Sequence, residues 1–362
     1  MISRVGAWPY DRVRRDLVDN PRTWLITGVA GFIGSNLLEE LLSLGQTVVG
    51  LDNFSTGHQA NLDDVMSSPA SAQGKFRLVR GDIRDLGACA KAMKGVDYVL
   101  HEAALGSVPR SIDDPITSHH VNVDGFLNVL VAARDAGVKR VIYASSCAVY
   151  GDCASVPLTE EQSGNLLSPY AATKLANEMY ASVFQRTYAL SLVGLRYFNI
   201  YGARQDPNGA YAAVIPKWIA ALLNGEACEI LGDGETSRDF CHVANVAQAN
   251  ILAATSSRSI GHAPVYNVGC GRETTLNELF RMIRLGLVGF QPAMAASQPV
   301  YGPFREGDIR RSAADIGRIQ LQLDYEPTHS TAQGLGQALE WYVEHSSQSA
   351  AAIEDRAIAG VR

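Results

Sequence analysis

The stretch WLITGVAGFIGSN, Trp24 to Asn36, decides how the chain folds. It passes from a short apolar segment through Gly28, Gly31 and Gly34, which are three residues apart, and into an amphipathic pattern. Glycine loses more conformational freedom on folding than any other residue, and it is a poor helix former. Three glycines at the point where a strand should give way to a helix therefore indicate that another group comes very close to this backbone.

Short β-rich runs alternate with longer helical patterns over the first two hundred residues. The patterns predict strands at 23–27, 46–51, 76–80, 97–101, 139–145 and 191–197. They predict helices at about 32–44, 84–94, 119–136 and 169–188. Apolar runs such as VVGL and VIYA lack polar alternation, which is typical of parallel strands covered on both faces. The sequence thus predicts an α/β fold built on a doubly wound, Rossmann-type parallel sheet.

This rhythm breaks after Asn199, where the chain becomes rich in Gly, Pro and single charges, with helices expected near 214–223 and 274–286. We expect a smaller C-terminal substrate-binding domain here, interrupted by a helix and strand that return to the first domain. We expect a leading helical extension at 1–21 and a main domain at 22–200, to which residues 241–268 return. The smaller domain is expected at 201–240 and 269–345, and a frayed tail at 346–362.

The composition excludes several classes of protein. The 362 residues carry a net charge of −6, which argues against a nucleic-acid partner. No apolar run approaches the roughly 20 residues that span a bilayer, and the first twenty residues lack the apolar core of a secretory signal. The six cysteines show no paired or Cys/His spacing, so we expect reduced thiols, a cytoplasmic protein and no metal site.

The glycine turn lies where open α/β sheets bind ligands, outside the carboxyl end of the first strand. Gly28 would permit the tight turn, Gly31 the approach of a pyrophosphate, and Gly34 the packing of helix on strand. The helix N-terminus then receives the phosphates. The GxxGxxG spacing is one residue longer than the common form, and a glycine-rich turn without a ligand is the alternative.

Asp52 ends the second strand about 20 residues beyond the turn, where a carboxylate can bind both ribose hydroxyls of a dinucleotide. Asn53 and Phe54 follow it, and no neighbouring arginine is present to hold a 2′-phosphate, which favours NAD over NADP. A simple loop aspartate is the alternative. Further along, Asp82 and Ile83 could meet the adenine, and the small Ala103 and Ala104 would let backbone touch the cofactor.

The segment SPYAATK holds Tyr170 and Lys174 four residues apart, on one face of a helix that Ser168 and Pro169 begin. The lysine and a cofactor pyridinium both favour phenolate, so we expect the tyrosine pKa to fall from about 10 and the residue to act as a base. Ser145 and Ser146 end the preceding strand, where a hydroxyl can bridge the substrate oxygen and Tyr170. Surface pairing of the tyrosine and lysine is the alternative.

Together TGVAGFIG, the SS…VYG stretch, YAATK and LRYFNIYG resemble the extended short-chain dehydrogenase/reductase family over nearly the whole chain. Within it, ALGSVPRSIDDP, GDGETSRDF and REGDIRRS are similar to bacterial UDP-N-acetylglucosamine 4-epimerases of surface-polysaccharide (O-antigen) pathways. The resemblance implies Tyr170 as acid/base, Lys174 as its partner and Ser146 as the assisting hydroxyl. It departs at Cys147 and Ala148, which replace hydroxyl residues of some relatives.

The resemblance also implies the residues that contact the two ligands. Besides the catalytic pair, those for NAD are Gly28, Gly31, Phe32, Ile33, Gly34, Asp52, Asn53, Phe54, Ser55, Thr56, Gly57, Asp82, Ile83, Ala103, Ala104 and Tyr197. Besides Tyr170, those for the substrate are Gly106, Ser107, Ser145, Ser146, Cys147, Asn199, Ala213, Val214, Lys217, Leu231, Arg238, Arg305, Asp308 and Ser312. Arg238 and Arg305 can clamp a diphosphate, and Asp308 can accept from uridine ribose hydroxyls.

The implied activity is a UDP-hexose 4-epimerase that interconverts UDP-N-acetylglucosamine and UDP-N-acetylgalactosamine through a 4-keto sugar, with NAD regenerated in each cycle. UDP-glucose and UDP-galactose are expected as further substrates, and a homodimer is expected through helices 119–136 and 169–188. One alternative is a nucleotide-sugar dehydratase or decarboxylase, although Cys147–Ala148 offers no carboxylate for elimination. The other alternative is a non-catalytic NAD-binding sensor, which would need neither Tyr170 nor Lys174.

Overall fold

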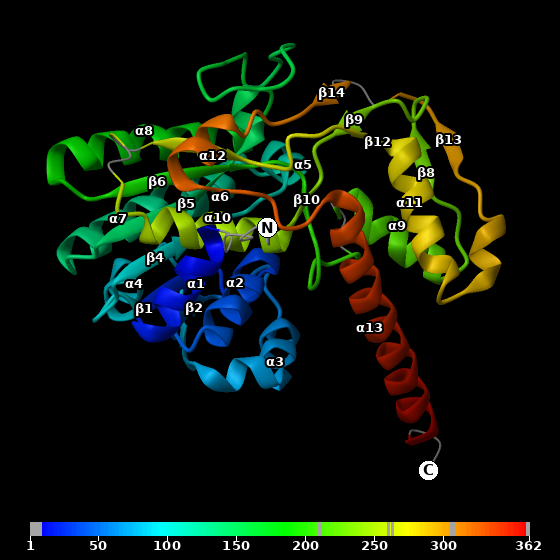
Figure 1. Ribbon diagram of the computed structural model, residues 1–362, viewed down its shortest axis with the longest axis horizontal. Helices are drawn as coiled ribbons and strands as arrows, with labels where there is room; N and C mark the ends of the chain where they lie inside the picture. The colour runs from blue at the N-terminus through cyan, green and yellow to red at the C-terminus, as the bar shows by residue number, and fades with distance from the viewer. Residues whose placement is uncertain (1–8, 209–211, 259–260, 262–263, 305–308, 360–362) are drawn as a thin grey trace, which may run out of the picture.

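The computed structural model describes residues 9–208, 212–258, 261, 264–304 and 309–359, with the backbone alone from 346 onward. It shows a large lobe, in which helices cover both faces of a sheet, and a smaller lobe beside it (Figure 1). Within the described residues, no helix is long and apolar enough to cross a membrane.

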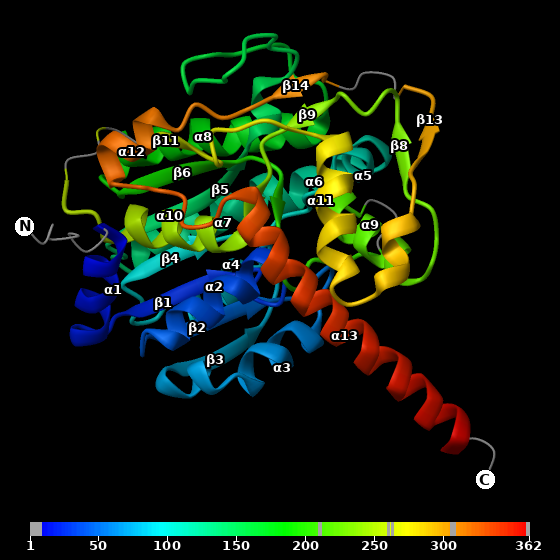
Figure 2. The same ribbon diagram turned by 45° about the vertical axis from the view of Figure 1, so that its right-hand side comes forward.

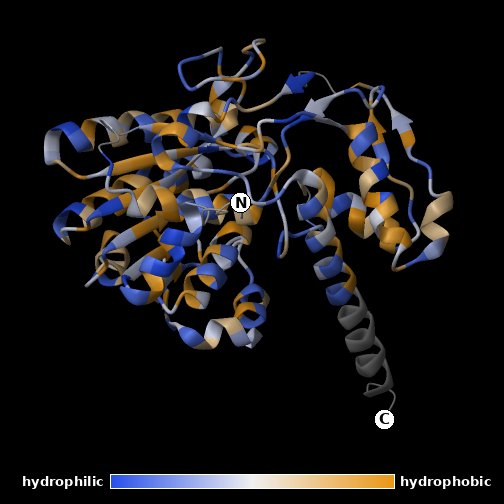
Figure 3. Cartoon of the chain, in the orientation of Figure 1, coloured by the Kyte–Doolittle hydropathy of each residue, from blue (hydrophilic) through white to orange (hydrophobic). Residues whose placement is uncertain are grey.

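The large lobe is built on a seven-stranded sheet in the order β11-β6-β5-β4-β1-β2-β3, and every neighbouring pair is parallel. The strands are β1 Thr23–Thr27, β2 Thr47–Asp52, β3 Lys75–Arg80, β4 Tyr98–His101, β5 Arg140–Ser146, β6 Leu192–Tyr197 and β11 Val265–Val268. Hydrophobic residues gather on these strands in Figure 3, as burial of both faces requires. The predicted Rossmann-type sheet is confirmed, and its order reverses between β1 and β4, where such sheets bind ligands.

Two apolar layers cover the sheet, one on each face. The first contains buried residues of α1 Pro9–Asp19, α2 Phe32–Ser43, α3 Gln59–Ser67, α10 Val243–Thr255 and α12 Gly317–Leu323. The second contains α4 Leu86–Ala92, α7 Gly125–Asp135 and α8 Pro169–Tyr188. The helix predicted at 119–136 is divided, because a π-helical turn at His120–Asp124 precedes α7. Two short helices, α5 Val108–Asp113 and α6 Pro115–His119, pack against α8 near its start.

The smaller lobe has its own apolar core, which α9 Val214–Leu223, α11 Leu276–Val288 and α13 Thr331–Ala359 share. Short strands lie within this lobe and between it and the large lobe. They are β7 Ile200–Tyr201 with β10 Cys241–His242, β8 Glu229–Leu231 with β13 Val300–Gly302, and β12 Thr274–Thr275 with β9 Ser237–Arg238 and β14 Arg311–Ser312. Figure 2 shows this lobe lying beside the carboxyl-terminal side of the sheet.

Two segments of the chain bear on the expected organisation. The segment after Cys241 returns to the large lobe, because α10 covers the sheet and Tyr266 of β11 pairs with Leu195 of β6. Beyond residue 345, where a frayed end is predicted, the backbone of α13 continues to Ala359 and extends away from the body in Figure 1. The helix is anchored where Trp341 Nε1 and His345 Nε2 lie 3.3 and 3.1 Å from the carboxylate oxygens of Asp64 in α3.

Candidate active site

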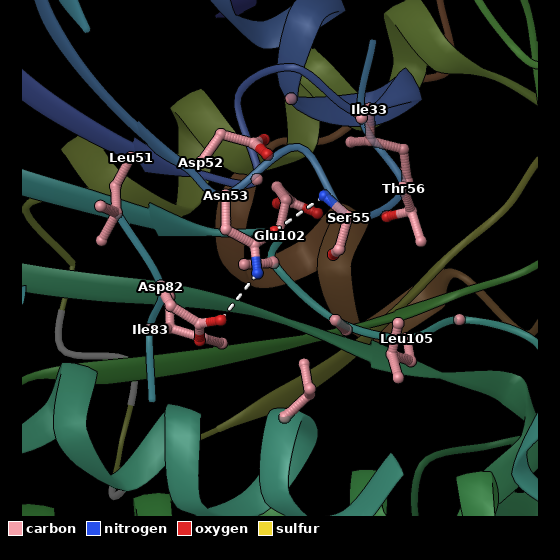
Figure 4. Close-up of a pocket in the computed structure, with 18 of the residues that line it drawn as sticks. Ile33, Leu51, Asp52, Asn53, Ser55, Thr56, Asp82, Ile83, Glu102 and Leu105 are labelled. Carbon is pink, nitrogen blue, oxygen red and sulfur yellow. Dashed lines mark hydrogen bonds between the residues drawn. The ribbon is translucent and has the colours of Figure 1, made fainter. Parts of the chain in front are cut away.

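A pocket of about 330 Å³ opens at the carboxyl ends of β1, β2 and β4, where the strand order reverses (Figure 4). Most residues predicted to bind the cofactor line it: Gly28, Gly31, Phe32, Ile33, Gly34, Asp52, Asn53, Ser55, Thr56, Gly57, Asp82, Ile83, Ala103 and Ala104. Gly106, predicted for the substrate, lines it too. The sequence analysis missed five further lining residues, namely Leu51, Gly81, Glu102, Leu105 and Val121.

The glycine turn has the shape that a close ligand requires. Gly28 adopts φ +70°, and a Cβ there would lie 2.8 Å from the backbone nitrogen of Ala103. A Cβ on Gly34 would collide with the carbonyl oxygen of Gly28, so this glycine lets α2 pack on the turn. Gly31 is the N-cap of α2, and no side chain caps the first N–H groups of the helix. These N–H groups and the positive end of the helix dipole fit a pyrophosphate.

Asp52 is almost fully buried at the end of β2, and its carboxylate lines the pocket. It accepts backbone hydrogen bonds from Ala30 at 2.8 Å and from Phe54 at 2.7 Å, which fix its direction. Phe54 itself does not line the pocket, and neither do Tyr170 and Lys174, so their contacts with the cofactor stay predictions. The Phe54 ring packs on the apolar core, and the Arg80 guanidinium stacks 4.4 Å from the ring centre.

Arg80 also bears on the expected absence of a partner for a 2′-phosphate. No arginine neighbours Asp52 in sequence, but Arg80 of β3 lies directly beside it in the strand register. The guanidinium is engaged elsewhere, because it stacks on Phe54 and donates to Gln59 Oε1 at 2.9 Å. Arg80 is therefore directed at these two side chains, and the preference for NAD that Asp52 predicts is kept.

Asp82 and Ile83 form the next part of the wall. Two hydrogen bonds from the Arg84 side chain, together with one from Asn53 at 2.8 Å, lower the pKa of Asp82 to about 2. The carboxylate is thus ionised at neutral pH. Ile83 packs so closely on Gly125 of α7 that a Cβ at this glycine would lie 2.6 Å from Ile83 Cδ1.

The predicted catalytic residues come together at the start of α8. Ser168 is the N-cap, with its hydroxyl accepting from the Ala171 N–H at 3.2 Å, and Pro169 is the first helical residue. Tyr170 follows, and the side chain of Ser146 at the end of β5 lies close enough to the phenol to act on its pKa, which it lowers. Lys174 is buried one turn later, where its Nζ donates to the Ala144 carbonyl at 2.8 Å.

The predicted lowering of the Tyr170 pKa depends on both Lys174 and the cofactor pyridinium, and the structure bears on the lysine alone. We expected Lys174 to help lower this pKa, but burial raises the pKa of Tyr170 to about 12, against the lowering effect of the Ser146 side chain. Burial also lowers the pKa of Lys174 to about 8. Lysine has little effect because its ammonium donates to Ala144 and lies 5.8 Å from the centre of the tyrosine ring. The protein alone therefore does not produce the phenolate.

Two further predicted contacts are corrected by side-chain direction. Ser145 is not a substrate contact, because it is buried and its hydroxyl donates to Glu178 Oε1 at 2.6 Å. Consecutive strand residues face opposite ways, so Ser146 alone points toward Tyr170. Tyr197 does not line the cofactor pocket either. Its hydroxyl donates to Glu102 Oε1 at 2.9 Å and thereby acts on the pocket through that carboxylate.

On the substrate side, the structure brings Cys147, Asn199 and Arg238 together. Burial raises the pKa of the Cys147 thiol to about 11, while the Arg238 charge and the Asn199 backbone N–H act to lower it. Cys147 also lies within the electrostatic reach of Tyr170. Ser312 of β14 is buried beside Arg238, with which it pairs in the strand register. Cys147, a predicted substrate contact, thus lies near the predicted catalytic Tyr170.

The other predicted substrate residues are more scattered. Ser107 caps α5, because its hydroxyl accepts from the Arg110 N–H at 3.1 Å. Ala213 precedes α9, which contains Val214 and the exposed Lys217, and Leu231 ends β8 in the smaller lobe. Arg305 and Asp308 lie outside the described residues. Where the structure describes the chain, no cluster of three or more His, Cys, Asp or Glu is arranged to hold a metal.

Known proteins are similar to this chain in sequence and in fold. The model of the NAD dependent epimerase/dehydratase family matches residues 24–269. A UDP-glucose 4-epimerase of Mycolicibacterium smegmatis is 39% identical over 321 residues, which cover 88% of this chain and 97% of the relative.

Two solved structures cover 90% of this chain each. One is a UDP-N-acetylglucosamine 4-epimerase from Methanobrevibacter ruminantium in complex with UDP-N-acetylmuramic acid; it is 37% identical, with a TM-score of 0.81 and 99% of that chain covered. The other is a dTDP-glucose 4,6-dehydratase from Streptomyces venezuelae, solved with NAD bound. It is 33% identical, with a TM-score of 0.78 and 98% of that chain covered.

Proposed function

The chain belongs to the NAD dependent epimerase/dehydratase family and is an NAD-dependent isomerase of UDP-sugars, and we propose that it interconverts UDP-N-acetylglucosamine and UDP-N-acetylgalactosamine. UDP-glucose and UDP-galactose are proposed as further substrates, and surface-polysaccharide synthesis as the use of the product. The observation that carries the proposal is the Ser146–Tyr170–Lys174 group beside the dinucleotide pocket.

In this mechanism the chain's own residues position the sugar and move one proton. Tyr170 takes the proton of the C4 hydroxyl, and Ser146 lowers the pKa of the phenol, which favours its ionised form. Lys174 supplies a positive charge near the phenol. Bound NAD would supply the acceptor for the C4 hydride and, once reduced, the donor that restores it. The first-turn N–H groups of α2 and the Asp52 carboxylate would hold that cofactor.

The choice between epimerase and dehydratase depends on the two residues after Ser146. Elimination of water needs an acid and a base besides the tyrosine. The chain has Cys147 and Ala148 here, and burial raises the pKa of the thiol to about 11. A neutral thiol and a methyl group supply neither a carboxylic acid nor a carboxylate, which favours epimerisation. The retention of tyrosine, lysine and serine in one group likewise argues against a non-catalytic sensor.

The preference for acetylated sugars rests on Ser312. It is a small buried residue next to Arg238, one of the proposed diphosphate contacts. Both orientations of the keto sugar must leave room for the C2 substituent, and an N-acetyl group is much larger than a hydroxyl. A serine at this position leaves that room, which a larger side chain would fill.

We further propose that the protein is a cytoplasmic homodimer. The six cysteines are free thiols, as a reducing compartment allows. Helix α8 exposes Met179, Tyr180 and Val183, with 65%, 39% and 53% of their surface accessible. Ile112 of α5 and Ile116 of α6 add apolar surface near α8. A second copy that covers this face would bury it, and the sedimentation coefficient of the purified protein tests for the dimer.

The experiment for the activity uses purified protein and UDP-N-acetylglucosamine without added cofactor. UDP-N-acetylgalactosamine should form, because regenerated NAD stays bound through each cycle. The Tyr170→Phe variant is the control for contaminating enzymes. A keto-deoxy sugar product would favour the dehydratase, and no conversion of any UDP-hexose would reject the proposed activity.

A further inference from the structure

Glu102 is an acidic residue at the reaction centre that neither the motif nor the catalytic group explains. It follows β4 directly, between the strand and the pocket-lining Ala103. Its side chain lines the dinucleotide pocket, and Figure 4 shows it among the other lining residues. An acidic side chain at this position faces a cofactor that carries a negatively charged pyrophosphate, so its charge needs a reason.

A hydrogen bond from Tyr197 fixes the orientation of the Glu102 carboxylate. Tyr197 of β6 donates its hydroxyl to Oε1 at 2.9 Å, and the same hydroxyl accepts from Asn250 Nδ2 of α10 at 2.8 Å. The other oxygen, Oε2, is shielded from solvent and has no hydrogen-bond partner among the described residues. A buried acceptor without a partner is costly. The chain of Asn250, Tyr197 and Glu102 thus fixes a carboxylate with one oxygen left for another group.

The charged and titratable groups near this carboxylate are those of the catalytic pair and the supporting tyrosine. The positive charge of Lys174 in α8 favours ionised Glu102, while burial opposes ionisation and raises the pKa of Glu102 to about 7. Reciprocally, the Glu102 charge raises the pKa values of Lys174 and of Tyr170. The adjacent His101 is buried and neutral at pH 7, because burial lowers its pKa to about 3.

We propose that Glu102 is a positioning residue that supplies the counter-charge of the reaction centre, where it stabilises the positive charges of Lys174 and of oxidised NAD. The part of the inference that concerns Lys174 rests on the proposed function. The reacting ring of the cofactor must lie beside Tyr170 and Lys174, and Glu102 lines the dinucleotide pocket, from which its charge acts on both residues. Oxidised NAD has a positive ring and reduced NAD a neutral one, so a fixed carboxylate nearby favours the oxidised form.

The Glu102→Gln variant keeps the shape and the acceptor for Tyr197 but removes the charge. In the pH profile of kcat/KM for UDP-N-acetylglucosamine, both limbs should move to lower pH by about one unit, because both pKa values lose the raising effect of the carboxylate. A role in packing alone would lower the whole profile without moving its limbs. Glu226→Gln, an exposed substitution in the smaller lobe, is the matched control.

A binding measurement makes the test independent of turnover. The ratio of the dissociation constants for NAD and NADH should rise about tenfold in Glu102→Gln at pH 8.5, where Glu102 is ionised. At pH 5.5, below the Glu102 pKa of about 7, wild type and variant should give the same ratio. Tyr197→Phe leaves Glu102 in place but removes the hydrogen bond that lowers its pKa, so this variant should approach Glu102→Gln near pH 7.

Each outcome decides one part of the inference. Unmoved limbs in a folded, active Glu102→Gln protein would overturn the effect on Lys174 and Tyr170. An unchanged ratio of dissociation constants at pH 8.5 would overturn the effect on NAD. If wild-type protein does not convert UDP-N-acetylglucosamine, the proposed function fails, and the ratio still decides whether Glu102 stabilises oxidised NAD.

Discussion

The Lys174 ammonium nitrogen lies 5.8 Å from the centre of the Tyr170 ring and makes its hydrogen bond to a backbone carbonyl instead of to the phenol. Lysine therefore has little effect on the tyrosine pKa, whereas the neighbouring Ser146 side chain lowers it. Mutations can therefore measure two effects separately: the effect of Ser146 on the tyrosine pKa and the contribution of the phenol as the base. Loss of the serine should change the tyrosine pKa, and loss of the phenol should remove the base itself.

Tyr170→Phe keeps the ring packing but removes the ionisable oxygen. We expect turnover of UDP-N-acetylglucosamine to fall by about 10² or more, the typical contribution of a positioned acid/base group, while NAD remains bound. Tyr188→Phe on the exposed face of the same helix serves as the control. Turnover within a few-fold of wild type in Tyr170→Phe would remove this residue from the role of base.

Ser146→Ala should shift the pH dependence in a predictable direction. The Ser146 side chain lowers the pKa of Tyr170, so its loss raises that pKa and moves the acidic limb of the kcat/KM profile to higher pH. Ser145→Ala is the matched control, because its hydroxyl bonds to Glu178 on the other side of the strand. If Ser145→Ala moved the limb and Ser146→Ala did not, the assignment of the two hydroxyls would be reversed.

Ser312→Tyr tests the proposed room for the N-acetyl group. A phenol ring in this close-packed position should abolish turnover of UDP-N-acetylglucosamine, while UDP-glucose or UDP-galactose should still react because Tyr170 and Lys174 are untouched. Steady-state rates with both substrate types give the comparison. Equal loss on both types would indicate damage to the fold, and full activity on the acetylated sugar would place Ser312 outside the pocket.

Glu178→Gln tests the support beneath the site. Glu178 forms a buried ion pair with Arg196, with N–O distances of 2.9 and 2.7 Å, and also accepts from Ser145. Both side chains of the pair are only 9% exposed, so removing one charge leaves the other buried without compensation. We expect the free energy of unfolding to fall by about 3 kcal/mol, measured by urea denaturation. Exposed Glu340→Gln should change it little, and equal stabilities would mean that the pair contributes nothing.

Local spacing made much of this site predictable. The glycine turn, Ser168 at the N-cap and Tyr170 with Lys174 each depend on residues a few positions apart, and helix and turn geometry then fixes their relation. Side-chain direction and register could not be deduced in the same way. Ser145 and Ser146 face opposite sides of the sheet, and spacing alone does not say which of them faces the site. Arg80 lies beside Asp52 only because β2 pairs with β3.

Glu102 was missed for a related reason. In LHEAAL it is one polar residue among small apolar ones, and the only signal was its place between a buried strand and the small Ala103. Its importance depends on Tyr197 and Lys174, which are distant in sequence. The effect of burial on the tyrosine pKa could not be deduced either, because no spacing reveals that burial outweighs the effects of the neighbouring protein groups.

The most direct test of 4-epimerisation follows the hydrogen on C4. UDP-N-acetylglucosamine labelled with deuterium at C4 is incubated with the protein in ordinary water, and the product is analysed by NMR and mass spectrometry. We predict UDP-N-acetylgalactosamine that retains the deuterium at C4, because the hydrogen leaves and returns within one closed site while only the hydroxyl proton passes through Tyr170. Loss of the label to water, or its appearance at C6, would contradict 4-epimerisation by this chain.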